Sequence, residues 1–243
     1  YMSQKIKTLL IGIGKIGCEY DYLMSEDYIM SHFKALSLNS DYEIVGILNT
    51  DCKKNKLFRI KNNYCIEESF EDLIKKNIKD PDLIVISSPT ITHRDTLYRA
   101  LKYFKPSIVL CEKPLSGNIL ESEQICKICH DNDIKLIVNY FRRSEPGMNE
   151  IYQLIRSQKL KNPKDGIINY SGGFFSNCSH FFDLMNNWFG EYKEFKTINC
   201  FKINNGDDFF WNGFITFENC NIYFNSMCEI DVTNHAFEII FEN

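Results

Sequence analysis

The sequence predicts an α/β fold, in which an N-terminal doubly wound parallel sheet is followed by a smaller α+β domain with a mostly antiparallel sheet. Two observations predict it. From Lys5 to Asn139, apolar runs of strand length alternate with amphipathic segments of helical period, which is typical of parallel βα units. After Asn139, strand-like segments follow one another with few helices between them, which favours antiparallel pairing. The expected domains are residues 1–118, with a closing strand and helix to about 141, and residues 142–243.

The first half is expected to contain five strands and three helices. Prolines after Asp80 and Lys105 interrupt the chain shortly before two of the apolar runs, where a helix must end before a strand begins. The predicted strands are Lys7–Ile11, Tyr42–Leu48, Leu83–Ser87, Ile108–Cys111 and Lys135–Val138. The predicted helices are Ser69–Lys76, Thr92–Tyr103 and Leu120–Asn132.

The second half is expected to contain two helices and four strands. The helix Ser179–Phe189 looks buried and ends at Gly190, a residue typical of helix C-termini. The turn Glu218–Asn221 indicates a hairpin. The chain stops after an apolar run at Asn243, so the second domain is expected to be short or truncated. The other predicted elements are the helix Glu145–Gln158 and the strands Gly166–Tyr170, Phe195–Lys202, Phe209–Glu218 and Asn221–Glu229.

Composition and charge favour a small-molecule ligand over nucleic acid or a membrane. The net charge is -4, which leaves no basic face for phosphate backbones. No apolar run approaches the ~20 residues that span a bilayer. The chain enters the run Lys5–Ile11 almost at once, so no signal peptide is expected, and Tyr1 before Met2 is interpreted as a tag remnant. Ten cysteines without framework spacing then predict reduced thiols and a cytoplasmic location.

One cysteine spacing resembles a haem or redox motif. Cys126, Cys129 and His130 read C-x-x-C-H. The segment has helical periodicity that puts both cysteines on one face, and no second cysteine pair completes a zinc site. We interpret these cysteines as core residues and predict no metal.

A glycine-rich turn follows the first predicted strand directly. It reads G-x-G-x-x-G, in which the first glycine permits a tight turn and the second lets the backbone approach a pyrophosphate. The third allows close helix packing. We therefore predict a Rossmann-type dinucleotide site; a glycine-rich turn that has lost its ligand is the alternative. The binding residues in this turn are Gly12, Ile13, Gly14, Lys15, Ile16 and Gly17.

The end of the second predicted strand leaves NAD and NADP open as the cofactor. An acidic residue there normally accepts hydrogen bonds from the adenosine ribose, whereas this chain has Asn49, followed by Thr50 and Asp51. Asn49 can bond a hydroxyl without repelling a 2′-phosphate, and Lys53 and Lys54 could attract one. We expect Asn49 and Asp51 to contact the cofactor in either case.

An insertion separates this strand end from the glycines. The link from Gly17 to Asn49 exceeds the usual ~20 residues. The excess lies around Glu19–Ser31 and is expected to form either a lid or a surface loop.

Three further segments resemble the Gfo/Idh/MocA family, which includes glucose-fructose oxidoreductase and inositol dehydrogenase. Residues 82–93, DLIVISSPTITH, are similar to the family's fourth strand with its Pro-containing turn and His. Residues 111–115 contain its E-K-P signature, and residues 172–183 resemble its G-G…H-x-x-D segment. The resemblance covers the chain almost end to end. It adds further cofactor-binding residues, namely Ser88, Pro89, Thr90, His93, Glu112 and Lys113.

Lys113 is the catalytic lysine that this resemblance implies, beside a cis bond to Pro114. It follows a strand at the end where ligands bind in open α/β sheets. Partial burial there would lower its pKa and let it exchange a proton with a hydroxyl as hydride leaves the same carbon. A surface lysine after a strand is the alternative.

His180 and Asp183 are the other catalytic candidates, and Arg143 is a substrate candidate. Because His180 and Asp183 lie three residues apart on a predicted helix, they share one face and could both meet the substrate and Lys113. The resemblance implies that Arg143 faces the substrate, where its fork of donors suits a carboxylate or phosphate. An interdomain ion pair is the alternative for Arg143.

Two positions depart from the family pattern. Many relatives carry an aspartate where this chain has Ser176, and others carry histidine or tyrosine where it has Asn187. The proton relay is therefore expected to differ or to be absent.

Together these features predict an NAD(P)-dependent oxidoreductase acting on a hydroxyl of a sugar, cyclitol or nucleotide-linked sugar. Hydride would pass between the substrate carbon and the nicotinamide while Lys113 handles the proton. The second domain would supply the substrate face and, as in relatives, the interface of a homo-oligomer, a dimer or tetramer. The alternative is a non-catalytic dinucleotide-binding relative acting in sensing or assembly, which Ser176, Asn187 and Asn49 favour.

Overall fold

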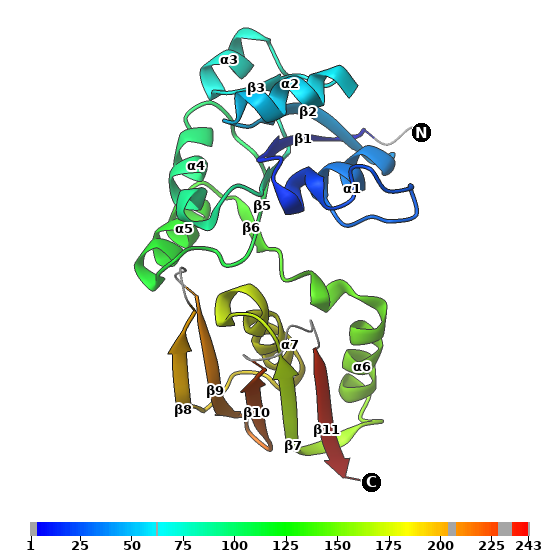
Figure 1. The fold of residues 1–243 in the computed structure, drawn as a ribbon, viewed down its shortest axis with the longest axis vertical. Coiled ribbons are helices and arrows are strands. Elements are labelled where there is room, and N and C mark those ends of the chain that lie inside the picture. Colours follow the sequence, from blue (N-terminus) through cyan, green and yellow to red (C-terminus); the bar gives the residue numbers. More distant parts are fainter. Residues whose placement is uncertain (1–3, 62, 204–207, 228–234, 243) are drawn as a thin grey trace. The chain divides into compact units, whose positions relative to one another are not determined.

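The computed structural model describes residues 4–61, 63–203, 208–227 and 235–242. The chain divides into two compact units, residues 1–139 and 140–243, each with its own sheet (Figure 1).

The first unit is built on a six-stranded parallel sheet in the order β3-β2-β1-β4-β5-β6. All five predicted strands are present, and a sixth, β3, is too short for periodicity to reveal. The strand order reverses beside β1, which is where ligands bind in doubly wound sheets. The strands are β1 Ile6–Ile11, β2 Tyr42–Leu48, β3 Ile66–Glu67, β4 Leu83–Ile86, β5 Ile108–Cys111 and β6 Lys135–Val138.

Helices alternate with these strands. The three predicted helices are confirmed, and side-chain caps fix two of their starts: Ser69 accepts from the Asp72 N–H, and Asn118 accepts from the Glu121 N–H. Two helices, α1 and α2, were not predicted. The elements are the short π-helix η1 Lys15–Glu19, the short 3-10 helix η2 Thr90–Thr92, and the α-helices α1 His32–Leu38, α2 Cys52–Lys61, α3 Phe70–Lys75, α4 His93–Ala100 and α5 Ile119–Asp131.

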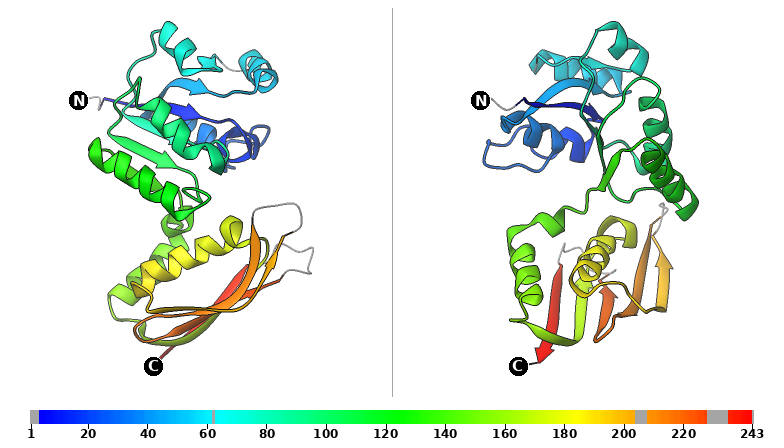
Figure 2. Two further views of the ribbon diagram at one scale, coloured as in Figure 1. Left: turned by 90° about the vertical axis from the view of Figure 1, so that its left-hand side faces the viewer. Right: turned by 180° about the vertical axis from the view of Figure 1, so that it is seen from behind.

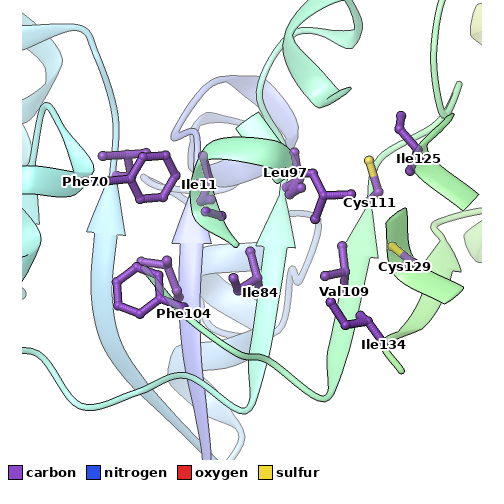
Figure 3. Packing of buried hydrophobic residues seen from close by; sticks show 14 of the residues in the cluster. Ile11, Phe70, Ile84, Leu97, Phe104, Val109, Cys111, Ile125, Cys129 and Ile134 are labelled. Carbon is purple, nitrogen blue, oxygen red and sulfur yellow. The ribbon is translucent and has the colours of Figure 1, made fainter. Parts of the chain in front are cut away.

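The sheet of the first unit carries a hydrophobic core on each face. Along β1, Leu9 and Ile11 join the cluster that packs under α3, α4 and α5, which Figure 3 shows. Leu10 points the opposite way, into a second cluster with residues of α1 and α2. This alternation confirms the doubly wound arrangement, because successive side chains of a strand face opposite sides of its sheet.

The C-x-x-C-H segment lies on α5, and the prediction for it was half right. Cys129 is a buried member of the core cluster, as predicted. Cys126, however, is exposed, so the two cysteines do not share the core-facing side. Among the described residues, no group of three or more His, Cys, Asp or Glu side chains could hold a metal ion.

The second unit is built on a five-stranded sheet in the order β11-β7-β10-β9-β8. Three of its four pairings are antiparallel, and β7 with β10 is parallel. The predicted hairpin joins β9 to β10. The prediction for β10 extended to Glu229, which lies outside the described residues. The elements are η3 Phe141–Ser144, α6 Pro146–Arg156, β7 Lys161–Tyr170, η4 Phe174–Cys178, α7 Ser179–Phe189, β8 Glu194–Lys202, β9 Phe209–Thr216, β10 Asn221–Ser226 and β11 Ala236–Glu242.

Both helices of the second unit cover the same face of its sheet, as the left view of Figure 2 shows. Its core includes both tryptophans, Trp188 from α7 and Trp211 from β9. On the uncovered face, Ile167, Tyr223 and Ile240 remain exposed by 41%, 44% and 57%. The second unit therefore buries one face of its sheet and leaves apolar side chains on the other.

Within the described part of the chain, every helix is too short or too polar to traverse a bilayer.

Candidate active site

A cleft of about 700 Å³ opens in the first unit, where β1, β2 and β4 end. Charged side chains of both signs line it, among them Lys15, Lys54 and Arg99 against Asp51 and Glu68. The volume is typical of small-molecule sites. Eight of the predicted cofactor residues line this cleft: Gly12, Gly14, Lys15, Ile16, Asn49, Asp51, Ser88 and Pro89.

Two glycines of the turn, Gly12 and Gly17, occupy positions where a larger residue would clash. Gly12 has φ +94°, and a Cβ atom there would lie 2.8 Å from the Ser88 nitrogen. A Cβ atom on Gly17 would clash with the carbonyl oxygen of Gly12. Around Gly14, by contrast, a Cβ atom would meet nothing within 4 Å. The open space beside Gly14 fits the backbone approach of a pyrophosphate, so the residues present suit a dinucleotide.

The end of β2 is braced by side chains rather than left open. Asn49 Oδ1 accepts a hydrogen bond from the Ile13 N–H at 3.4 Å, and its Nδ2 donates to Asn55 Oδ1 at 2.8 Å. Asn55, which is fully buried, returns a bond from its Nδ2 to the Asn49 carbonyl at 2.7 Å. Asn49, predicted as a cofactor contact, therefore also holds the glycine turn against α2.

The segment after β4 contacts the E-K-P segment through His93. Its buried ring places Nε2 2.9 Å from the Ser88 carbonyl oxygen and Nδ1 3.2 Å from that of Leu115. Thr90 begins η2, directly after the cleft residue Pro89. His93 thus joins the cleft wall to the loop that carries Lys113.

Glu112, the acidic residue of that loop, is buried and heavily bonded. Its Oε1 lies 2.7 Å from His32 Nε2 and accepts from Asn139 Nδ2 at 2.6 Å, while Oε2 accepts from the Lys113 N–H at 3.3 Å. Burial acts to raise the pKa of Glu112, but the bonds from His32 and Asn139 outweigh it and keep the pKa below its ordinary value. His32 and Asn139 are site residues that the sequence analysis missed, since neither stands in a recognised motif.

Lys113 lies two residues after the end of β5 and is half-buried. Its peptide bond to Pro114 is cis, as the resemblance implies. The loop is held on both sides of Lys113. The Glu112 carboxylate is hydrogen-bonded on one side, and His93 contacts the Leu115 carbonyl oxygen on the other.

His180 lies in α7 of the second unit and is 4% exposed. The rings of Tyr140 and Phe141 meet its imidazole edge to face, with centroids 5.6 and 5.0 Å away. Lys113 belongs to the first unit and His180 to the second, so their meeting on one substrate stays a prediction.

Asp183, one helical turn after His180, forms an ion pair with Arg143. The Nε and Nη2 atoms of Arg143 each donate to one carboxylate oxygen at 2.5 Å. Burial raises the pKa of Asp183 above its ordinary value, and Arg143 acts against that rise. The pair joins η3 to α7, and both elements belong to the second unit.

The paired glycines before α7 serve the turn that leads into it. Gly172 has φ +78°, and a Cβ atom on Gly173 would clash with the carboxylate of Asp208. That carboxylate accepts bonds from the Phe175 and Ser176 N–H groups, each at 2.9 Å. The Ser176 hydroxyl bonds the Gly173 backbone. Asp208, which lies far away in sequence, was missed.

Comparison with known proteins supports the resemblance noted in the sequence. The model of an oxidoreductase family with an NAD-binding Rossmann fold, GFO_IDH_MocA, matches residues 6–140, more than half of the chain. The chain belongs to this family. Membership confirms the predicted class of cofactor and leaves NAD and NADP open.

Among this chain's relatives in the Gfo/Idh/MocA family are cyclitol dehydrogenases. It is 27% identical to an inositol 2-dehydrogenase of Rhizobium meliloti and 24% identical to a myo-inositol 2-dehydrogenase of Thermotoga maritima. Each match covers 75% of this chain and 54% of the relative, so the chain spans about half the length of these proteins.

A solved structure shares the fold over nearly the whole chain. The WlbA dehydrogenase of Bordetella pertussis, in complex with NADH and UDP-GlcNAcA, superposes with a TM-score of 0.75 at 16% identity. The match covers 98% of this chain and 76% of the other.

Proposed function

We propose that this member of the Gfo/Idh/MocA family is an NAD(P)-dependent dehydrogenase or reductase that acts on the CH–OH group of a sugar, cyclitol or nucleotide-linked sugar. One observation carries the proposal. The glycine-lined cleft and the E-K-P loop with Lys113 belong to the same unit, and His93 braces one against the other. The names of the relatives support the substrate class.

Each candidate residue has a role in this proposal. When bound, a nicotinamide dinucleotide supplies the hydride acceptor or donor. Lys113 Nζ takes the hydroxyl proton, and His180 hydrogen-bonds the same oxygen. Asp183, which Arg143 holds, supplies a carboxylate one helical turn after His180 on the same helix. Because two nitrogens of Arg143 already bind Asp183, a direct bond from Arg143 to substrate is not part of the proposal.

A polyol panel with a matched lysine control tests the proposal. The chain is mixed with NAD or NADP and with myo-inositol, glucose or a UDP-sugar, and reduced nicotinamide is followed by absorbance. We expect turnover on at least one substrate, and Lys113→Ala lowers it by about 10²-fold or more while cofactor affinity is kept. Lys102→Ala, an exposed lysine of the same unit, leaves the rate unchanged. Equal rates for the two variants would contradict the role of Lys113.

The second candidate is a dinucleotide-binding protein without dehydrogenase activity. Two site groups already have partners, since the Asp183 carboxylate is paired with Arg143 and the Ser176 hydroxyl bonds the Gly173 backbone. Cofactor binding together with no turnover on any polyol supports this candidate. Binding of neither NADH nor NADPH refutes both.

We also propose a homo-oligomer, a dimer or tetramer, formed through the uncovered face of the five-stranded sheet. Ile167 and Tyr223 are paired in register on that face, and both are exposed. Apolar patches of this kind on a sheet favour association. Sedimentation of the wild type and of Tyr223→Lys tests it, with a shift of the variant to monomer expected.

Nine described cysteines are free thiols, which supports a reducing, cytoplasmic compartment as part of the proposal. Fractionation of cells that express the protein tests this location.

A further inference from the structure

The adenosine end of the cleft carries an ion pair that bears on the choice between NAD and NADP. In Rossmann domains, the end of the second strand meets the ribose whose 2′ position is phosphorylated only in NADP. Here Asn49, Thr50, Asp51 and Lys54 line the cleft, from the end of β2 into the first turn of α2. A cation at this place would favour the phosphate, and a carboxylate would oppose it.

Asn49 does not make this choice on its own. Its amide bonds the Ile13 N–H and Asn55 Oδ1, as described above, so its side chain is engaged in holding the turn. An amide is also uncharged, so it neither attracts nor repels a phosphate strongly. The charges around it decide the preference.

Lys54, in the first turn of α2, is a cation that lines the cleft close to this strand end, and it already forms an ion pair with Glu19. Its Nζ lies 2.5 Å from Glu19 Oε1, with both side chains about 43% to 44% exposed. Hydrogen bonding to Glu19, together with the nearby charge of Asp51, raises the pKa of Lys54 above its ordinary value. Glu19 therefore compensates the positive charge that a 2′-phosphate would meet at this ammonium group.

Asp51 places a second negative charge at the same corner. Its Oδ1 accepts hydrogen bonds from the backbone N–H groups of Lys53 at 3.0 Å and Lys54 at 3.1 Å. These bonds begin α2 and fix the carboxylate beside the cleft. Two carboxylates, those of Asp51 and Glu19, thus stand beside Lys54, the lysine of this corner that lines the cleft, and this suits a neutral hydroxyl better than a phosphate.

Another cationic side chain of the cleft wall also has partners. Arg99 lies over the ring of Phe70 at 5.5 Å from its centroid and pairs with Glu71 at 3.7 Å. Its charge is therefore already shared with a carboxylate, as that of Lys54 is.

We propose that Glu19 selects NAD over NADP by neutralising Lys54, the cation that would otherwise bind the 2′-phosphate. Glu19 is then a specificity-determining residue, and it lies at the end of η1, two residues after the glycine motif. The inference rests on the cofactor part of the proposed function. It adds a preference that neither the motif nor family membership supplies.

The test compares the binding of two fluorescent cofactors, so it needs no substrate. NADH and NADPH are titrated into the full chain at low salt, and the ratio of their dissociation constants is measured. We expect the wild type to bind NADH more tightly. Glu19→Gln is expected to narrow the ratio by roughly fivefold, mainly through tighter NADPH binding, since a freed exposed cation is worth about 1 kcal/mol toward a phosphate.

Two variants make the test specific. In Glu19→Gln/Lys54→Gln, the gain in NADPH binding is lost, because the cation itself is gone. Asp131→Asn breaks the exposed Lys127–Asp131 pair on α5 and changes the net charge equally, and it leaves the ratio unchanged. Circular dichroism confirms that each variant is folded. Raising the salt concentration shrinks the gain of Glu19→Gln, because the phosphate contact is screened.

Two results overturn the inference. One is a wild type that prefers NADPH, and the other is Glu19→Gln with an unchanged ratio although both cofactors bind. In both cases the proposed dehydrogenase function survives. If neither cofactor binds the wild type, the cofactor part of the proposed function fails and the inference fails with it, so the two failures are distinguishable.

Discussion

Replacing Arg143 by Gln would leave the Asp183 carboxylate without its ionic partner. The two bonds at 2.5 Å are lost, and the carboxylate stays in a site where its side chain is only 13% exposed. Removing one partner of a fully buried pair costs about 3–5 kcal/mol, whereas a fully exposed pair contributes about 0–1 kcal/mol. Because the Arg143 side chain is 44% exposed, we expect an intermediate loss of roughly 2 kcal/mol in the free energy of unfolding.

The loss should depend on pH in one direction. Burial already raises the pKa of Asp183 above its ordinary value, and without Arg143 the pKa rises further. A carboxyl with a higher pKa in the folded state holds its proton more tightly there. The destabilisation of Arg143→Gln by the unpaired Asp183 carboxylate is therefore absent in acid, where the carboxyl is protonated, and it grows as the pH rises through the pKa of Asp183 in the folded state. We expect the difference between Arg143→Gln and the wild type to shrink from about pH 7 to about pH 4.5.

Tryptophan fluorescence suits this measurement, because both tryptophans of the chain, Trp188 and Trp211, lie in the core of the second unit. Urea unfolding at the two pH values gives the free energies. Lys193→Gln is the control, since it breaks the exposed Lys193–Glu218 pair of the same unit, and we expect it to cost less than about 1 kcal/mol. The reasoning is refuted if both variants lose the same amount, or if the loss from Arg143→Gln grows on acidification.

Three further predictions concern the first unit. Gly17→Ala should destabilise the first unit by about 1–3 kcal/mol, because the new Cβ atom meets the Gly12 carbonyl. Gly14→Ala should melt like the wild type but bind NADH more weakly. Circular dichroism measures the melting, and cofactor fluorescence measures the binding. Glu112→Gln should cost about 1–2 kcal/mol near neutrality. A carboxyl whose pKa is lowered in the folded state stabilises the protein above its unfolded-state pKa, and this stabilisation is lost as the pH falls through the folded-state pKa. The cost of Glu112→Gln should therefore vanish in acid. A loss of stability that persists in acid would contradict this prediction. Burial raises the pKa of the Cys111 thiol to about 12, so Cys111 should resist alkylation under native conditions. The exposed Cys52, Cys126 and Cys200 should react. Peptide mass spectrometry measures the labelling, and early labelling of Cys111 would argue against the fold.

The sequence predicted the elements whose pattern is local. Strands such as Leu83–Ile86 are continuous apolar runs, and α5 has a capping Asn118 before a periodic segment. The helix α2 was missed because its lysines and polar residues obscure any apolar face. The helix α1 was missed because it is short and directly follows the insertion Glu19–Ser31.

Site residues were predictable where a motif carries them. Gly12, Gly14 and the residues around Lys113 stand in recognisable patterns, and the cleft forms beside the first two. The pairs Arg143–Asp183 and Glu19–Lys54 join residues far apart in the chain, and a single sequence holds no signal for such contacts. The insertion was predicted as a lid or a loop. In the structure its Asp21 carboxylate accepts bonds from the N–H and hydroxyl of Ser31 and from the Met30 N–H, which ties the insertion to the start of α1.

The strand order of the second unit has a consequence for how the chain folds. β7 lies between β10 and β11, so the first strand of this sheet to be synthesised has both of its neighbours much later in the sequence. Asp165 of β7 pairs with Asn221 and Ile240, and these contacts close long loops, which slows folding. In the first unit, β1 already finds a neighbour in β2. During synthesis on a ribosome, the nucleotide-binding unit can therefore fold while β7 is still unpaired. The unpaired backbone groups of β7 are where aggregation would begin.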